Sequence, residues 1–148
     1  MNKNSGFTLI ELLIIIAIFA IITTLALPRF ESTLENFKLN LAGEQVARHI
    51  ALAREKALSE GVTVRLIFDL HSKDNYQILV SIQGSKFVLP PGVKFSYTNF
   101  PGNTLEFYPS GVPSQGGTVA ISGKYKTYYV IVTPVTARVR IGDSPPVY

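Results

Sequence analysis

One acidic side chain stands inside the longest apolar stretch of the chain, where a charge needs a chemical reason. Residues 7–27 contain a single charged side chain, Glu11. A carboxylate at membrane depth costs about 2.5–3.5 kcal/mol on insertion scales, so it is expected to have a partner. The 21 residues of this stretch would span roughly 31 Å as a helix, which matches the hydrocarbon core of a bilayer.

Three interpretations of this stretch compete. A cleaved secretory signal peptide fits the basic Lys3 and the apolar run, but Glu11 interrupts its core and no good cleavage site follows. A plain membrane anchor leaves Glu11 unexplained. The third interpretation rests on the residues Gly6-Phe7-Thr8-Leu9-Ile10-Glu11, which resemble the class III signal of type IV pilins and type II secretion pseudopilins.

The resemblance implies a defined processing site. A prepilin peptidase would cut after Gly6 and the new amino terminus of Phe7 would be methylated, which puts Glu11 at the fifth mature position and Pro28 at the twenty-second. The Phe7 amine of one subunit would pair with Glu11 of a neighbour, because each charge offsets the cost of desolvating the other. The implied partners are other pilins or pseudopilins, the prepilin peptidase and the inner-membrane assembly platform.

The helix that carries this signal is predicted to continue to Gly61. We expect Pro28 to kink or unwind it, Gly43 to weaken it and Gly61 to cap it. Apolar residues recur at helical spacing after Pro28, which predicts a stripe covered by a β-sheet. The stripe consists of Phe30, Leu34, Phe37, Leu41, Val46, Ile50, Ala53 and Ala57.

From residue 62 onward the apolar pattern has a period of two, which predicts strands. The proposed strands are separated by turn residues, with no helical stretch between them, which favours antiparallel strands in two small sheets stacked on the helix. They cover residues 62–70, 76–82, 86–89, 93–97, 104–108, 118–122, 127–133 and 136–141.

A second resemblance lies in this β-rich half. It is similar to the GspH/FimT domain over residues 105–111, over the run Gly116-Gly117-Thr118 and over residues 137–141. This chain has Ala137 where the family pattern has a glycine. We therefore expect an α+β, pilin-like fold with a long N-terminal helix on antiparallel sheets. Its predicted parts are a leader (1–6), a transmembrane helix (7–27), an amphipathic continuation (28–61), a GspH/FimT-like domain (62–142) and a tail (143–148).

Enzymatic chemistry finds little support in the sequence. The chain has no cysteine and two histidines, His49 and His71, neither of which lies in a catalytic motif; we interpret both as solvated. Asp69, His71 and Asp74 lie close together in the sequence, but polar turns often have this composition. We predict no catalytic residue, no metal site and no cofactor.

Charge is unevenly distributed. The net charge is +4, and residues 75–142 hold six basic side chains against one acid. Two of the six lie on a predicted hairpin near three tyrosines, and two more alternate with apolar residues, so both should face the exposed side of a strand. Basic and aromatic side chains together can bind DNA, although a solvated sheet face or a subunit contact explains these four charges more simply. These four residues are Lys124, Lys126, Arg138 and Arg140.

Together these features predict a minor pseudopilin, a structural subunit of a type II secretion pseudopilus. It would be a single-pass protein of the bacterial inner membrane, with its globular domain on the periplasmic or extracytoplasmic side, assembled into a filament. The alternative is a FimT-like minor type IV pilin that binds DNA for uptake or primes pilus assembly. A third possibility is an unrelated membrane-anchored binding domain.

Overall fold

The computed structural model describes residues 7–145, with the side chains of residues 25–29 excepted. The chain forms two compact units, residues 1–34 and residues 35–148, which we describe separately. Helix α1, Leu9–Glu60, contributes to both units.

The first unit is built from the beginning of α1. The helix continues through residue 28 without a break, so the local unwinding expected at Pro28 is not seen. The hydroxyls of Thr23 and Thr24 donate to the carbonyls of Phe19 (2.7 Å) and Ala20 (3.0 Å), which satisfies two polar groups on an otherwise apolar surface. No helix formed by the described residues combines the length and the apolar character that crossing a membrane requires. The expected membrane helix over residues 7–27 stays a prediction.

The second unit holds eight strands in two four-stranded antiparallel sheets. The first sheet has the order β3-β2-β1-β5 and the second has the order β4-β6-β7-β8. The strands are β1 (Val64–Phe68), β2 (Asn75–Val80), β3 (Gln83–Val88), β4 (Lys94–Thr98), β5 (Thr104–Phe107), β6 (Gly117–Ser122), β7 (Thr127–Val132) and β8 (Val139–Gly142), with a short 3-10 helix, η1 (Pro101–Asn103), before β5. The predicted α+β, pilin-like fold is confirmed.

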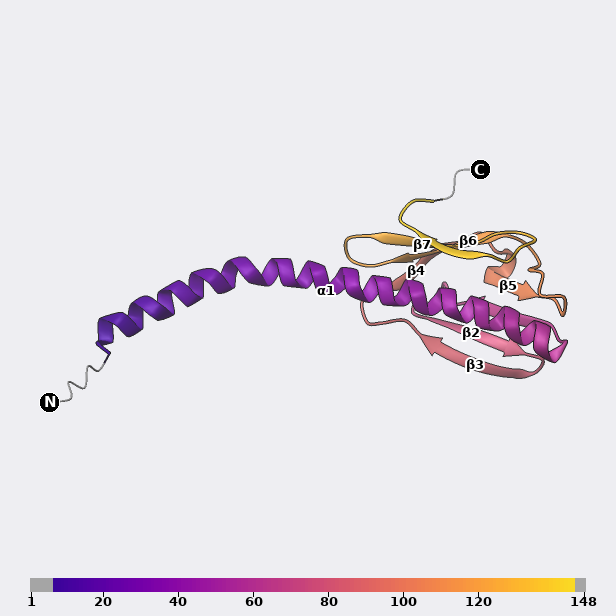
Figure 1. Cartoon of the computed structure of the whole chain (residues 1–148), viewed down its shortest axis with the longest axis horizontal. Coiled ribbons are helices and arrows are strands. Elements are labelled where there is room, and N and C mark those ends of the chain that lie inside the picture. Colours follow the sequence, from indigo (N-terminus) through magenta and orange to yellow (C-terminus); the bar gives the residue numbers. More distant parts are fainter. Residues whose placement is uncertain (1–6, 146–148) are drawn as a thin grey trace. The chain divides into compact units, whose positions relative to one another are not determined.

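Residues 35–60 of α1 lie along both sheets (Figure 1). Gln45 contacts the first sheet, where its amide donates to the Tyr76 hydroxyl at 3.2 Å. Gly43 lies against the second sheet, because a Cβ built there would meet Ile141 at 3.6 Å and Tyr128 at 3.9 Å. The helix therefore closes one core that both sheets share.

The apolar stripe of α1 is buried only over its second part. Val46, Ile50, Ala53 and Ala57 are fully buried, as predicted. The first part of the prediction is wrong: Phe30, Leu34, Phe37 and Leu41 are 42–70% exposed. The buried face instead begins with Leu39 and Ala42, because these side chains point toward the sheets while the earlier stripe lies on another side of the helix.

Two turns depend on backbone in the left-handed region. Gly61 has φ +65° at the end of α1, which confirms the predicted C-cap. Ala137 has φ 53° although it carries a side chain. Its N–H donates to the Thr133 carbonyl at 3.1 Å, and the Thr133 N–H donates to the Arg138 carbonyl at 2.9 Å. The turn before Arg138 therefore forms without the family's glycine, at a strain cost of about 1–2 kcal/mol.

Candidate assembly site and interaction surfaces

Glu11 caps the start of its own helix. Its Oε2 accepts the backbone N–H of Thr8 at 2.8 Å and the Thr8 hydroxyl at 2.9 Å, while the Thr8 hydroxyl oxygen accepts the Glu11 N–H at 3.3 Å. This reciprocal arrangement is a capping box, which satisfies backbone donors that the helix leaves free at its N-terminus.

The capping box adds a role that our sequence analysis missed. Threonine followed three residues later by glutamate is the sequence signature of the motif, so Thr8 and Glu11 could have been paired from the sequence. The box engages Oε2, and Oε1 takes no part in it. A cation from a neighbouring molecule could therefore approach Oε1 without breaking the cap.

The other predicted processing and assembly residues are only partly described. Gly6 and the side chain of Pro28 lie outside the described residues. Phe7 is described and is 84% exposed. Cleavage after Gly6 and pairing of the Phe7 amine with a neighbour's Glu11 stay predictions.

The four basic residues do not form one cluster. Lys124 and Lys126 lie at the turn between β6 and β7, where the Lys124 ammonium stands 5.2 Å from the centre of the Tyr125 ring. Arg140 pairs with Ile131 of β7, whereas the lysines lie next to Thr127 at the start of that strand. Thr127 and Ile131 are four residues apart, which is about 14 Å at 3.4 Å per residue.

Arg138 and Arg140 nevertheless share a surface with aromatic side chains. Tyr129 and Ile131 of β7 face the same side of the second sheet as Arg140, and Tyr129 lies opposite Ala120, which in turn lies opposite Tyr97. Tyr97 is 53% exposed. This basic-aromatic surface, formed by Tyr97, Tyr129, Arg138 and Arg140, is smaller than the four-charge patch that the sequence offered as an alternative to a solvated sheet face.

His49 is not a solvated histidine, which corrects our interpretation. Its Nδ1 lies 2.6 Å from the hydroxyl of the fully buried Tyr76, and its ring lies 4.1 Å from that of Phe87 between centroids. Gln45 donates to the same Tyr76 hydroxyl at 3.2 Å, so this buried hydroxyl is shared by two side chains of α1. Burial raises the pKa of Tyr76 to about 12, and desolvation lowers the pKa of His49.

This environment predicts a pH-dependent stability. Because the pKa of His49 is lower in the folded chain than the ordinary value near 6.5, folding favours the neutral ring. Stability is therefore fully present above pH 6.5 and falls as the pH drops from there toward the lower, folded-state pKa. We expect the melting temperature to fall as the pH is lowered from about 8 to about 5. The substitution His49→Gln should remove this pH-dependent fall.

His71 provides the control for this experiment. Its side chain is exposed in the turn between β1 and β2, so His71→Gln should keep the pH-dependent loss. An unchanged pH profile in His49→Gln would contradict the assignment to His49.

The polar turn around Asp69 holds itself together without a ligand. Hydrogen bonds from the Ser72 hydroxyl and from the backbone N–H groups of Ser72 and His71 lower the pKa of Asp69 to about 2. Asn75 donates to the second oxygen of Asp69 at 3.3 Å. Within residues 7–145, no group of three or more acidic or histidine side chains is arranged to hold a metal ion.

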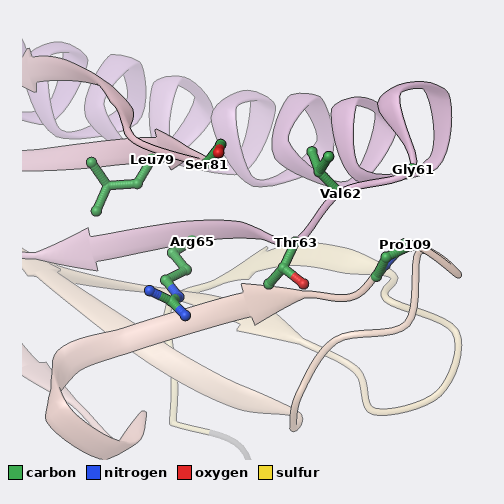
Figure 2. A pocket seen from close by; sticks show the side chains of 7 residues that line it. All are labelled: Gly61, Val62, Thr63, Arg65, Leu79, Ser81 and Pro109. Atoms are coloured by element: carbon green, nitrogen blue, oxygen red, sulfur yellow. The ribbon is translucent and has the colours of Figure 1, made fainter.

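A hollow of about 380 Å³ lies where α1 ends (Figure 2). Arg65, Thr63, Ser81 and Leu79 line it together with the backbone around Gly61. The Arg65 Nε donates to Glu106 Oε1 at 2.7 Å across the β1–β5 pair. Because this carboxylate balances the guanidinium charge, the hollow has no net charge that would favour an ionic ligand.

A capped N-terminal helix that is continuous with a domain of two antiparallel sheets defines a pilin-like protein. Two family matches agree with that class. Residues 1–27 match the family described as the prokaryotic N-terminal methylation motif, and residues 42–136 match the family described as type II transport protein GspH. The chain therefore belongs to the GspH family, a family of structural pilin-like subunits.

Several known proteins are similar to this chain. The competence protein ComGD of Bacillus subtilis (strain 168) is 23% identical over 141 residues, which cover 95% of each chain. The minor pseudopilin EpsH of Vibrio cholerae has the same fold, with a TM-score of 0.59 at 15% identity over 72% of this chain and 97% of EpsH. The type IV minor pilin FimU of Pseudomonas aeruginosa (strain PAO1) has a TM-score of 0.56 at 17% identity over 75% of this chain and 91% of FimU.

Proposed function

We propose that this chain is a minor pseudopilin that serves as a structural, non-enzymatic subunit of a type II secretion pseudopilus. It is cut after Gly6 by a prepilin peptidase, methylated on Phe7 and held in the inner membrane by residues 7–27. Its β-rich domain lies on the extracytoplasmic side, and it joins other pseudopilins through the assembly platform.

The observation that carries this proposal is the combination of two family matches on one continuous helix. The methylation motif covers residues 1–27, the GspH match begins at residue 42, and α1 extends across the interval. The capped carboxylate of Glu11 lies at the start of that helix. A charge placed there can pair with a neighbour's amine and so fix the axial position of one subunit relative to the next, because an unpaired charge in an apolar phase is costly.

Mass spectrometry of the mature N-terminus tests the proposed processing. Chain produced in a host with a prepilin peptidase should begin at a methylated Phe7. The same chain from a peptidase-deficient host should begin at residue 1 or 2. A mature protein that starts at any other residue would overturn the proposal.

A second function is favoured by the similarity to the competence protein, which extends over 95% of both chains. In this alternative the chain is a minor type IV pilin that binds DNA for uptake. The basic-aromatic surface would hold the backbone with Arg138 and Arg140 and stack bases on Tyr97 and Tyr129. Its small number of charges predicts weak binding that depends strongly on salt.

A gel shift with the full chain in detergent micelles tests DNA binding. We expect Arg138→Ala with Arg140→Ala to weaken low-salt binding about tenfold or more, because two phosphate contacts are lost. Lys124→Ala with Lys126→Ala is the matched control and should have a smaller effect, because these lysines lie away from the surface. No binding at low salt, or binding that survives the double arginine substitution, would reject this function.

A further inference from the structure

Strand β3 presents an open edge. It is the last strand of the first sheet, and no described strand pairs with its outer side. The Leu89 N–H donates to the Asp74 carbonyl at 2.7 Å, which extends the register in which Asn75 lies opposite Val88. Hydrogen-bonded and free positions alternate in an antiparallel pair. The N–H and C=O groups of Gly84 and Lys86 therefore point away from β2.

The other sheet edges in the described part of the chain have fewer backbone groups free to pair with an added strand. The outer side of β5 is covered, because the Ser114 N–H donates to the Glu106 carbonyl at 2.8 Å. On β4, the Phe95 N–H donates to the Lys73 carbonyl at 2.7 Å. Strand β8 is open but has only four residues, against six in β3. At the end of β3, the Val88 carbonyl also points away from β2, and it accepts the side-chain amide of Gln45 at 3.1 Å. The rest of the β3 edge, with the outward groups of Gly84 and Lys86, is open to an added strand.

A cavity of about 100 Å³ lies beside this edge, between β3 and α1. It is lined mainly by apolar side chains, Leu52 of α1, Ile78 and Val80 of β2, and Phe87 of β3. Leu52 is 40% exposed, so part of its apolar side chain remains uncovered.

Lys56 lies one helical turn after Leu52 and also lines the cavity. The ion pairs formed by the described residues involve other side chains, and Lys56 has no carboxylate partner among them. Lys86, in contrast, interacts with the Asp74 carboxylate. The open side of the cavity therefore carries an unneutralised positive charge next to an apolar hollow.

We propose that β3 and this cavity bind an extended segment of a partner protein, which adds a strand to the first sheet. Its backbone pairs with Gly84 and Lys86, an apolar side chain fills the cavity against Leu52, and a carboxylate two residues further meets Lys56. The spacing agrees, because alternate residues of a strand are about 6.8 Å apart and four residues of a helix rise about 6 Å. This partner contact goes beyond filament membership and does not depend on it.

The experiment uses the full chain in detergent micelles and a synthetic eight-residue peptide. The peptide consists of threonine except for one leucine and, two positions later, one aspartate. Amide hydrogen exchange is followed by NMR at Gly84 and Lys86. We expect saturating peptide to slow both amides by about tenfold or more, because new backbone hydrogen bonds protect them.

Two substitutions at one position separate strand addition from other binding modes. Lys86→Pro removes an outward N–H that β2 does not use, which an edge strand tolerates, and it should abolish the protection of Gly84. Lys86→Ala loses the same side chain but keeps the N–H, so it should retain the protection. Equal binding by both variants would overturn the proposal.

The charge contact is tested independently of the edge. Lys56→Gln and exchange of the peptide aspartate for asparagine should each weaken binding by about threefold, and the two changes together should weaken it no further than one alone. Strictly additive effects would contradict the contact with Lys56. No protection of Gly84 and Lys86 at millimolar peptide, or protection of β8 in their place, would reject the site.

Discussion

Glu11→Ala should reduce incorporation of this subunit into filaments by about 100-fold or more, because in the pairing that we propose it leaves a neighbour's buried amine without its counter-charge, a loss of about 3–5 kcal/mol. Cleavage after Gly6 and methylation of Phe7 should be unaffected, since Glu11 lies beyond the site of the cut. Subunit recovered in sheared filaments, divided by subunit in the membrane, measures the first effect, and mass spectrometry measures the second.

Thr8→Ala is the matched control for this prediction. It removes the hydroxyl that donates to Glu11 Oε2 at 2.9 Å but leaves the carboxylate in place. Loss of a helix cap costs about 1 kcal/mol, so assembly should fall by about fivefold. If Thr8→Ala and Glu11→Ala are equally defective, Glu11 acts through the cap and the charge-pairing argument fails. Normal assembly of Glu11→Ala would remove both roles.

Gly116→Ala should be the most destabilising single-methyl addition in the β-rich domain. A Cβ at Gly116 would lie 2.4 Å from Pro134 Cδ and 2.7 Å from Pro134 N, which is backbone and cannot move aside. Overpacking of this kind costs about 3 kcal/mol, which corresponds to a fall in Tm of about 10 °C. Circular dichroism of the full chain in micelles measures the change.

Gly43→Ala adds the same methyl group with the opposite expected result. Its Cβ would make ordinary contacts of 3.6–3.9 Å with Ile141 and Tyr128, and alanine is favoured over glycine inside a helix by about 1 kcal/mol. The variant should therefore unfold at a higher temperature than the parent chain. A lower Tm for Gly43→Ala, or an unchanged one for Gly116→Ala, would show that these close approaches do not limit stability.

The two glycines show how far the sequence analysis could reach. The sequence correctly placed Gly43 inside a helix, and Gly116 ahead of the strand predicted over residues 118–122. Neither pattern could indicate whether a methyl group would fit. That depends on Pro134 in one case and Ile141 in the other, residues that lie far along the chain.

Some residues of the candidate site and interaction surfaces could be recognised from the sequence, and others only from the structure. Glu11 could be singled out from the sequence, because it is the only charge in residues 7–27 and it follows a recognisable run of residues. The surroundings of His49 could not, because Tyr76 reaches it across 27 residues. The separation of Lys126 from Arg140 follows from the register of β7 with β8, which a list of charges does not contain.

The sequence by itself determined the local features: the strands, from their period of two; the end of α1, from Gly61; and the N-terminal methylation motif, from the order of residues 6–11. Each of these depends on backbone preferences or on neighbours within a few residues. Only the tertiary structure decided that α1 buries Leu39 and Ala42 and leaves Phe37 exposed, and that β3 keeps an open edge beside an apolar cavity. These outcomes depend on which distant surfaces meet, because the free energy of burial is gained only when a second surface covers the first.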